Sequence, residues 1–302
     1  MIPARAGAAA APAGLRELVS DYYELTKPRI IYLLLITTAA AMVMAAHGIP
    51  PLALTFWTLV GGALSAGSAG ALNCVFDRDI DRLMRRTMMR PLAAGRMAPL
   101  PATIYAAVLG VASFALLYAM VNPLAAWLSL IGLVYYVLVY TMWLKRSTTM
   151  NIVIGGAAGS LPPLVGWAAV TGSIGAPAIA LALLVFLWTP PHFWALALMT
   201  GTDYSVAKVP MLPNVHGERR TQIEILIYTI VTAVMAVSLY PLHVMGIWYF
   251  VPAVILNGLF LIDAVRLFSG PIKQRSRKLF KFSLLYLALM CAAMVLDRLI
   301  IT

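Results

Sequence analysis

The sequence predicts an all-α polytopic membrane protein, with nine transmembrane helices bundled around a central cavity. Of its 302 residues, 62% are hydrophobic and only 11% are charged. The mean hydropathy of +0.89 leaves too few polar side chains to cover a water-soluble domain. Apolar runs of about 18–23 residues recur along the chain, each long enough to cross a bilayer as a helix. These runs lack the alternating pattern of membrane barrel strands, which leaves helices as the spanning elements.

The spans are expected in one domain covering residues 26–302. Residues 1–25 are rich in Ala, Gly and Pro and lack the continuous apolar core of a signal peptide, so they predict a disordered cytoplasmic tail. The predicted spans are approximately 30–47, 53–75, 102–121, 124–143, 150–170, 177–199, 222–240, 246–267 and 279–299.

Basic residues predict how the chain is oriented in the membrane. With these spans, 21 of the 22 Lys and Arg residues fall on one side, and only Arg298 falls on the other. Cytoplasmic loops are enriched in Lys and Arg, so we expect the N-terminus inside and the C-terminus outside, in the cell's inner membrane. The same rule explains the net charge of +11, so no nucleic-acid partner is implied.

Two long connections carry most of the polar chemistry, and both are expected on the cytoplasmic side. The first loop covers residues 76–101 and the second loop covers residues 200–221. Just before and within the first loop, Asn73, Asp77 and Asp81 recur every four residues. On a helix this spacing places them along one face, which we call the polar stripe. Two carboxylates and an amide oxygen on one face suit a hard divalent cation such as Mg²⁺.

Arginines accompany the polar stripe. Arg86 and Arg90 follow it, and guanidinium groups grip phosphate oxygens in pairs, so a cation with a diphosphate is favoured. The alternative is a loop whose charges only neutralise each other. That alternative accounts for three residues that point off the stripe: Arg78, Asp79 and Arg82. It accounts poorly for the stripe itself, because the repulsion between its two carboxylates would need a cation.

The second loop offers a weaker site. It contains Asp203, Tyr204 and Lys208, and the lysine suits a phosphate oxygen. A complete second cation site would need another carboxylate, but Ala207 stands four residues after Asp203. The alternative is a cytoplasmic turn punctuated by prolines.

Prolines also mark two of the predicted spans. Pro190 and Pro191 are expected to break the sixth span, and His192 follows them among aromatic residues. This histidine is either a hydrogen-bonded core residue or a substrate contact. In the fifth span, a run of small residues before two prolines predicts a kink beside a cavity. Near the first span, Lys27 serves either as an interfacial anchor or as an anion contact.

These motifs together resemble the UbiA-type intramembrane prenyltransferases, from about residue 20 onward. The polar stripe at the end of a second span is shared by many of them. Other segments resemble the heme-farnesylating members more specifically: Leu25-Thr26-Lys27-Pro28-Arg29, Arg86-Thr87-x₂-Arg90-Pro91-Leu92, Thr189-Pro190-Pro191-His192-Phe193-Trp194, Asp203-Tyr204 and Val209-Pro210-Met211-Leu212-Pro213.

The resemblance implies transfer of the farnesyl group of farnesyl diphosphate to the 2-vinyl group of heme B, with water added, giving heme O. It implies a Mg²⁺–diphosphate site at Asn73, Asp77 and Asp81, with Arg86 and Arg90 as diphosphate clamps. It also implies substrate contacts for three residues: His192, Asp203 and Tyr204. Lys208 stands where the family has a small residue. Membrane lipid, heme A synthase and terminal-oxidase assembly are the implied surroundings and partners, and a homo-oligomer is compatible with the sequence.

Three other functions compete with this one. A prenyltransferase of another acceptor, such as a quinone precursor or chlorophyllide, would share the polar stripe. A transporter would need its site near the membrane midplane, whereas these charges cluster at one face. A non-catalytic heme-handling factor gives no reason for the polar stripe.

Overall fold

The computed structural model describes residues 14–300, which contain helices and no β-strand. Within that range, nine helices are long and apolar enough to cross a membrane, which confirms the predicted class. These candidate spans are Pro28–Ala46, Leu52–Phe76, Pro99–Met120, Pro123–Ser147, Asn151–Thr171, Ala176–Val206, Leu212–Ser238, Ile247–Phe268 and Ile272–Ile300. The central cavity and the sidedness of the termini stay predictions.

Several spans comprise more than one helical element. In chain order the elements are α1 (Leu15–Leu25), α2 (Pro28–Ala46), α3 (Leu52–Phe76), α4 (Arg78–Asp81), α5 (Pro99–Met120), α6 (Pro123–Val134), the π-helix η1 (Tyr135–Leu144), α7 (Lys145–Ser147), α8 (Asn151–Gly155), the 3₁₀-helix η2 (Gly156–Ser160), α9 (Leu161–Thr171), α10 (Ala176–Val206), α11 (Leu212–Ser238), α12 (Ile247–Val265), the 3₁₀-helix η3 (Arg266–Phe268) and α13 (Ile272–Ile300).

Local sequence explains where many of these helices begin. Proline occupies the first turn of α2, α5, α6, α9, α10 and α11, where its missing N–H costs no hydrogen bond. The side chain of Asn122 caps α6 by accepting from the N–H of Ala125 at 2.9 Å. Asp297, from the end of α13, accepts from two N–H groups at the start of α12, those of Gly246 and Tyr249.

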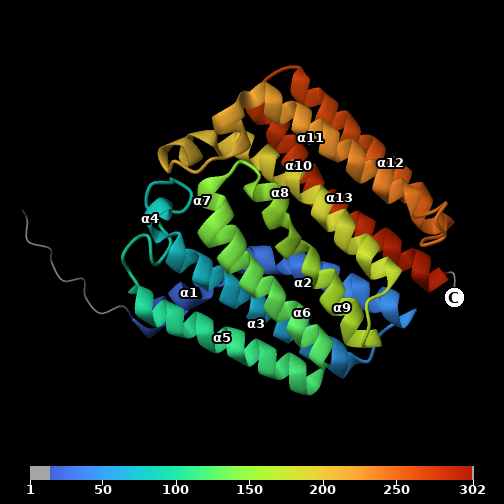
Figure 1. Cartoon of the computed structure of the whole chain (residues 1–302), viewed down its shortest axis with the longest axis horizontal. Coiled ribbons are helices and arrows are strands. Elements are labelled where there is room, and N and C mark those ends of the chain that lie inside the picture. Colours follow the sequence, from blue (N-terminus) through green and yellow to red (C-terminus); the bar gives the residue numbers. More distant parts are fainter. Residues whose placement is uncertain (1–13, 301–302) are drawn as a thin grey trace, which may run out of the picture.

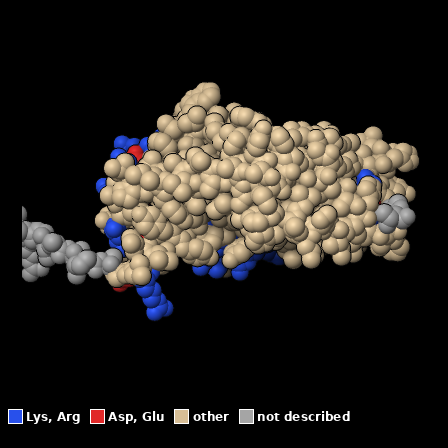
Figure 2. All heavy atoms as spheres, turned by 90° about the horizontal axis from the view of Figure 1, so that it is seen from below, with Lys and Arg blue, Asp and Glu red and all other residues tan. Residues whose placement is uncertain are grey.

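The helices pack as two adjoining groups. One group contains α2, α3, α5, α6 and α9, and the other contains α10 to α13. The groups meet where α2 packs against α13 and where α10 packs against α9 and η2. In Figure 1 the helices run side by side, with α1, α4 and α7 at one end and the C-terminus at the other. Lys and Arg gather toward the former end, which we call the basic end (Figure 2).

Part of the predicted disordered tail is a helix. Residues 15–25 form α1, whereas residues 1–13 lie outside the described part of the chain. The helix is tied to the first loop by Arg96, whose guanidinium lies 2.8 Å from Asp21 and 3.3 Å from Glu24. This long-range ion pair gives α1 a fixed place that its composition alone did not predict.

Two helix irregularities differ in how well they were predicted. In the fifth span the 3₁₀-helix η2 interrupts the α-helix between α8 and α9, while the kink and the cavity beside it stay predictions. The break at Pro190 and Pro191 is wrong: α10 continues through both prolines, and its backbone departs from helical geometry at Thr200 instead. Transmembrane helices tolerate proline when neighbouring helices satisfy the backbone, and α10 packs against α11, α13 and η2.

Candidate functional site

The polar stripe forms where α3 passes into α4, at the basic end. Asn73 lies in the last turn of α3, Asp77 caps that helix, and Asp81 ends α4. Backbone bonds from Asp77 N–H to Asn73 O (2.9 Å) and from Asp81 N–H to Asp77 O (2.8 Å) carry the four-residue spacing through the junction. All three side chains are buried, at 3%, 0% and 1% exposure. The structure therefore brings the three predicted residues onto one buried face.

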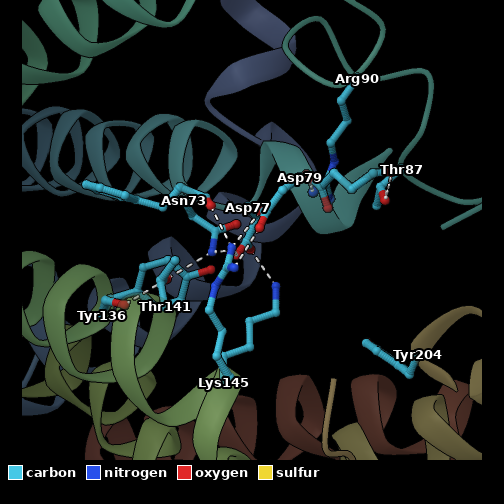
Figure 3. Close-up of polar contacts among 12 residues, drawn as sticks. Asn73, Asp77, Asp79, Thr87, Arg90, Tyr136, Thr141, Lys145 and Tyr204 are labelled. Atoms are coloured by element: carbon cyan, nitrogen blue, oxygen red, sulfur yellow. Dashed lines mark hydrogen bonds and ion pairs between the residues drawn. The ribbon is translucent and has the colours of Figure 1, made fainter. Parts of the chain in front are cut away.

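A chain of hydrogen bonds fixes the Asn73 end of the polar stripe (Figure 3). The Asn73 side-chain amide donates to Asp77 Oδ2 and to Thr141 Oγ1, both at 2.9 Å. Thr141 in turn donates to the carbonyl of Tyr136, five residues earlier, at 2.9 Å. This bond follows the wider register of the π-helix η1, and π-helical turns are frequent at functional sites. The amide of Asn73 is thereby oriented with its Oδ1 turned away from Asp77.

Three cations meet the oxygen atoms of the stripe. Lys27 donates to Asn73 Oδ1, and Lys145 donates to Asp77 Oδ2. Arg90 donates to Asp81 Oδ2 at 2.7 Å. We expected the repulsion between the two carboxylates to need a bound cation; this reasoning is wrong, because Lys145 and Arg90 each neutralise one of them. Burial lowers the pKa of Lys27 below its ordinary value.

Each carboxylate nevertheless keeps one oxygen without a hydrogen-bond partner. Asp77 Oδ1 and Asp81 Oδ1 are buried and have no hydrogen bond within residues 14–300. The guanidinium of Arg146 lies 3.8 Å from Asp77 Oδ1. Leaving a buried acceptor unsatisfied costs free energy, about 1–3 kcal/mol and more for a charged group. Two such oxygens on one face fit a hard cation such as Mg²⁺, which takes oxygen ligands.

The protein alone supplies only part of a metal shell. Among the described residues no group of three or more His, Cys, Asp or Glu side chains could hold an ion. Mg²⁺ is commonly bound by one or two carboxylates, with phosphate oxygens and water completing its shell. Two free carboxylate oxygens surrounded by arginine and lysine therefore suit a metal that arrives with a phosphate-bearing substrate.

The first and second loops meet at Arg86. Its guanidinium donates to the hydroxyl of Tyr204 at 2.8 Å and lies 5.0 Å from the centre of that ring. Its backbone N–H donates to Asp203 Oδ2 at 3.4 Å. Three of the predicted residues thus come together across the two loops. Lys208 does not join them: it is exposed, its backbone is left-handed, and within residues 14–300 its side chain makes no hydrogen bond or ion pair with these groups.

Asp79 is paired differently from what we expected. We predicted that Arg78, Asp79 and Arg82 would neutralise each other within the loop. Instead, Arg146 from α7 donates two bonds to Asp79, both at 2.7 Å, and lowers the pKa of that carboxyl to about 2. Arg82 donates to the carbonyl of Ala93 at 3.1 Å, which shapes the first loop. Beside these residues lies an open hollow of about 350 Å³, lined by Val75, Phe76, Arg78 and Asp79.

His192 lies on α10, where that helix packs against α13. It is 6% exposed, and its Nδ1 lies 2.7 Å from the hydroxyl of Ser283. Its ring stacks against Trp188 and Phe280. The structure thus shows the hydrogen bond expected of a core histidine, and its contact with substrate stays a prediction.

Sequence reasoning missed most of the partners of the polar stripe. Lys145 is one of the 21 basic residues expected on the cytoplasmic side, and neither it nor Thr141 is among the predicted site residues. Lys27 was recognised as an anion contact or an anchor, but its bond to Asn73 was not foreseen. The signal that could have found Lys145 is its place as the first charged residue after an apolar span, where a buried charge needs a partner.

Residues 34–289 match the UbiA prenyltransferase family. The chain is 54% identical over 284 residues to a protoheme IX farnesyltransferase of Synechocystis sp., covering 93% of this chain and 90% of the relative. It is also 54% identical to the protoheme IX farnesyltransferase of Gloeobacter violaceus, covering 94% and 93% of the two chains.

Solved structures show the same fold at low identity. The chain matches a structure described for digeranylgeranylglyceryl phosphate synthase with a TM-score of 0.77 at 20% identity, covering 94% of this chain and 99% of the other. It matches a UbiA homologue from Archaeoglobus fulgidus, solved with GPP and Mg²⁺, with a TM-score of 0.69 at 19% identity, covering 91% and 99%. The chain therefore belongs to the UbiA prenyltransferase family, within its protoheme IX farnesyltransferase group.

Proposed function

We propose that this prenyltransferase transfers the farnesyl group of farnesyl diphosphate to the 2-vinyl group of heme B, and that water adds to give heme O and diphosphate. The observation that supports farnesyl diphosphate as the donor is a pair of buried carboxylate oxygens, one on Asp77 and one on Asp81. Both lack a hydrogen-bond partner and lie among cationic side chains. The names of the relatives at 54% identity support heme B as the acceptor.

The polar stripe would hold Mg²⁺ through Asp77 Oδ1 and Asp81 Oδ1, with Asn73 beside them. When bound, Mg²⁺ neutralises charge on the diphosphate oxygens. Lys145 and Arg90, which now neutralise the two carboxylates, would then be free to turn toward the diphosphate. The UbiA homologue from Archaeoglobus fulgidus was solved with GPP and Mg²⁺, which supports a divalent-metal-assisted mechanism in this family.

The cations of the site act on the leaving group. As the allylic C–O bond breaks, the diphosphate gains negative charge, so Arg86 and Arg90 stabilise the transition state more than the bound substrate. The π-electrons of the vinyl group then form the new C–C bond to the farnesyl carbon. Water adds to the cation left beside the porphyrin and releases a proton. The helices around the site limit access of bulk water, which would otherwise capture the farnesyl cation early.

For the acceptor we propose contacts from His192, Asp203 and Tyr204. Tyr204 and Asp203 accept hydrogen bonds from Arg86, so they would connect the acceptor contacts with the residue proposed to bind the diphosphate. Lys208 is left out of this assignment because its side chain is exposed. We further propose that the basic end faces the cytoplasm and that the protein resides in the cell's inner membrane, with its site on the cytoplasmic face.

The test is product analysis with purified protein in lipid nanodiscs. The protein is given farnesyl diphosphate, Mg²⁺ and either heme B or the quinone precursor 4-hydroxybenzoate, and products are identified by mass spectrometry. We expect the heme reaction to yield a porphyrin heavier by one farnesyl and one hydroxyl group. Prenylation of 4-hydroxybenzoate without change to heme would refute the proposed acceptor.

A pair of variants tests the site in the same assay. Asp77→Asn removes the charge of a buried stripe residue, whereas Asp79→Asn removes an exposed charge two residues away. We expect product formation to fall by two orders of magnitude or more for the first variant, in the range seen when a key electrostatic group is removed, and by less than about tenfold for the second. Equal effects would contradict the assignment of the stripe.

A further inference from the structure

His192 is enclosed by aromatic rings on both of its faces. The Trp188 ring lies 4.3 Å away, centre to centre, at an interplanar angle of 19°. The Phe280 ring lies 4.6 Å away at 22°. Two nearly parallel neighbours can stack only on opposite faces of one ring. The imidazole therefore can interact with a ligand only through its edge, where its two nitrogens lie.

One of those nitrogens, Nδ1, already makes a hydrogen bond. The hydrogen bonds around it define which ring nitrogen carries the proton. His192 Nδ1 lies 2.7 Å from Ser283 Oγ, and the same Oγ lies 2.8 Å from the carbonyl oxygen of Phe280. A carbonyl can only accept, and a hydroxyl has a single proton. Only one arrangement makes both bonds: Ser283 donates to Phe280 O, and His192 Nδ1–H donates to Ser283 Oγ. The neutral ring then has its lone pair on Nε2.

Ser283 is itself held firmly in place. It is fully buried on α13, and its backbone carbonyl accepts from the indole N–H of Trp188 at 2.8 Å. One residue thus fixes both the imidazole and one of the rings stacked on it. Nε2, in contrast, has no hydrogen-bond partner among residues 14–300, and it is not among the fully buried polar atoms that lack one.

We propose that Ser283 is a positioning residue that holds His192 as the Nδ1-protonated tautomer, so that Nε2 offers its lone pair to the iron of the heme acceptor. This inference rests on the proposed function. A neutral imidazole whose other nitrogen donates to a fixed oxygen is the form in which histidine usually binds metals, because that bond sets both tautomer and ring orientation. Ser283 reaches the iron only through His192.

The tautomer can be measured without any substrate. The chain has four histidines, so ¹⁵N-histidine labelling gives a simple NMR spectrum, and the His192 signals are those lost in His192→Gln. We expect a protonated Nδ1 and a bare Nε2 in the unmodified protein and in Ser283→Thr, which keeps the hydroxyl. In Ser283→Ala we expect a mixture of tautomers. A protonated Nε2 in the unmodified protein, or an unchanged spectrum in Ser283→Ala, would overturn the proposal.

Heme titration tests the consequence for binding. Heme B is added without farnesyl diphosphate, and absorption and electron paramagnetic resonance spectra are recorded. We expect a histidine-bound iron signature in the unmodified protein and Ser283→Thr, its loss in His192→Gln, and heme affinity weakened on the order of 10–100-fold in Ser283→Ala. The control is Ser276→Ala, which removes a buried α13 hydroxyl that has no hydrogen-bond partner within residues 14–300.

The outcomes separate this inference from the proposed function. If heme O forms but the iron signature survives in His192→Gln, Nε2 is not the ligand and the inference fails while the proposed function stands. If the tautomer and its Ser283 dependence are observed but only a non-heme acceptor is prenylated, the proposed function fails together with the iron ligand. A Ser276→Ala spectrum changed as much as that of Ser283→Ala would refute a specific role for Ser283.

Discussion

Lys145→Met should destabilise the protein in a way that Mg²⁺ and diphosphate can reverse. Lys145 is the hydrogen-bonded cationic partner of Asp77, whose side chain is fully buried. Methionine has a similar length but no charge, so the variant leaves a buried carboxylate with only the Asn73 amide and Arg146, 3.8 Å from its other oxygen. A bound metal would restore the missing counter-charge.

The expected size follows from the burial of the pair. Removing one partner of a buried ion pair typically costs about 3–5 kcal/mol. The remaining contacts of Asp77 place Lys145→Met near the lower end, at roughly 3 kcal/mol. We expect Lys145→Met to have a lower melting temperature than the unmodified protein, measured in detergent by intrinsic fluorescence. Adding Mg²⁺ with diphosphate should raise the melting temperature of the variant more than that of the unmodified protein, since ligands that bind only the folded state stabilise it.

The matched control is Arg220→Met, which removes the cation of the Arg220–Glu224 pair at 2.6 Å, where the arginine is 60% exposed. Exposed pairs contribute about 0–1 kcal/mol, so this variant should melt close to the unmodified protein and respond equally to the ligands. The reasoning is refuted if Lys145→Met melts like the control, or if Mg²⁺ and diphosphate shift both variants by the same amount.

Three further variants test other parts of the account. Asp77→Ala should lose nearly all heme O formation while still reaching the membrane fraction, as followed by mass spectrometry and immunoblotting; near-normal turnover would remove Asp77 from the metal site. Tyr204→Phe deletes only the acceptor of the Arg86 bond at 2.8 Å, so the KM for farnesyl diphosphate should rise about fivefold, equivalent to about 1 kcal/mol, and an unchanged KM would show that this bond is not used. Gly166→Ala would place a Cβ 2.2 Å from the carbonyl oxygen of Thr38 and should lower stability by roughly 1–3 kcal/mol or more, whereas Gly258→Ala meets nothing within 4 Å and should be neutral or slightly stabilising in the same thermal assay.

The spans and the polar stripe were predictable because their signals are local. Each span is a continuous apolar run, and the spacing of Asn73, Asp77 and Asp81 depends only on helical geometry. The connection between Arg86 and Asp203 was not predictable in the same way, because 117 residues separate them. Family resemblance grouped those residues, but only the fold shows that they touch.

The partners of the stripe illustrate what sequence could not supply. Lys145 lies 68 residues from Asp77, and its approach depends on the ten-residue π-helix η1, which no pattern in the sequence announces. Repulsion between two carboxylates four residues apart on a helix is therefore not the reason for a bound cation, because Lys145 and Arg90 already neutralise both of them. The unpartnered oxygens of Asp77 and Asp81 give a better reason, and they are visible only in the structure.

The two prolines of the sixth span do not interrupt its helix. Pro190 and Pro191 predict a break within the sixth span, yet α10 continues through both and departs from helical geometry at Thr200. The rule describes an isolated helix, whereas α10 is packed on several sides by α11, α13 and η2. That packing keeps His192 on a continuous helix, next to Trp188 and opposite Ser283.

The metal dependence of heme O formation tests the central claim most directly. Purified protein is incubated with farnesyl diphosphate and heme B, either with Mg²⁺ or with EDTA, and heme O is quantified by mass spectrometry. We predict heme O with Mg²⁺ and essentially none with EDTA, with activity restored when Mg²⁺ is added back in excess. Equal amounts of heme O under both conditions would contradict the assignment of Asn73, Asp77 and Asp81 as a metal–diphosphate site.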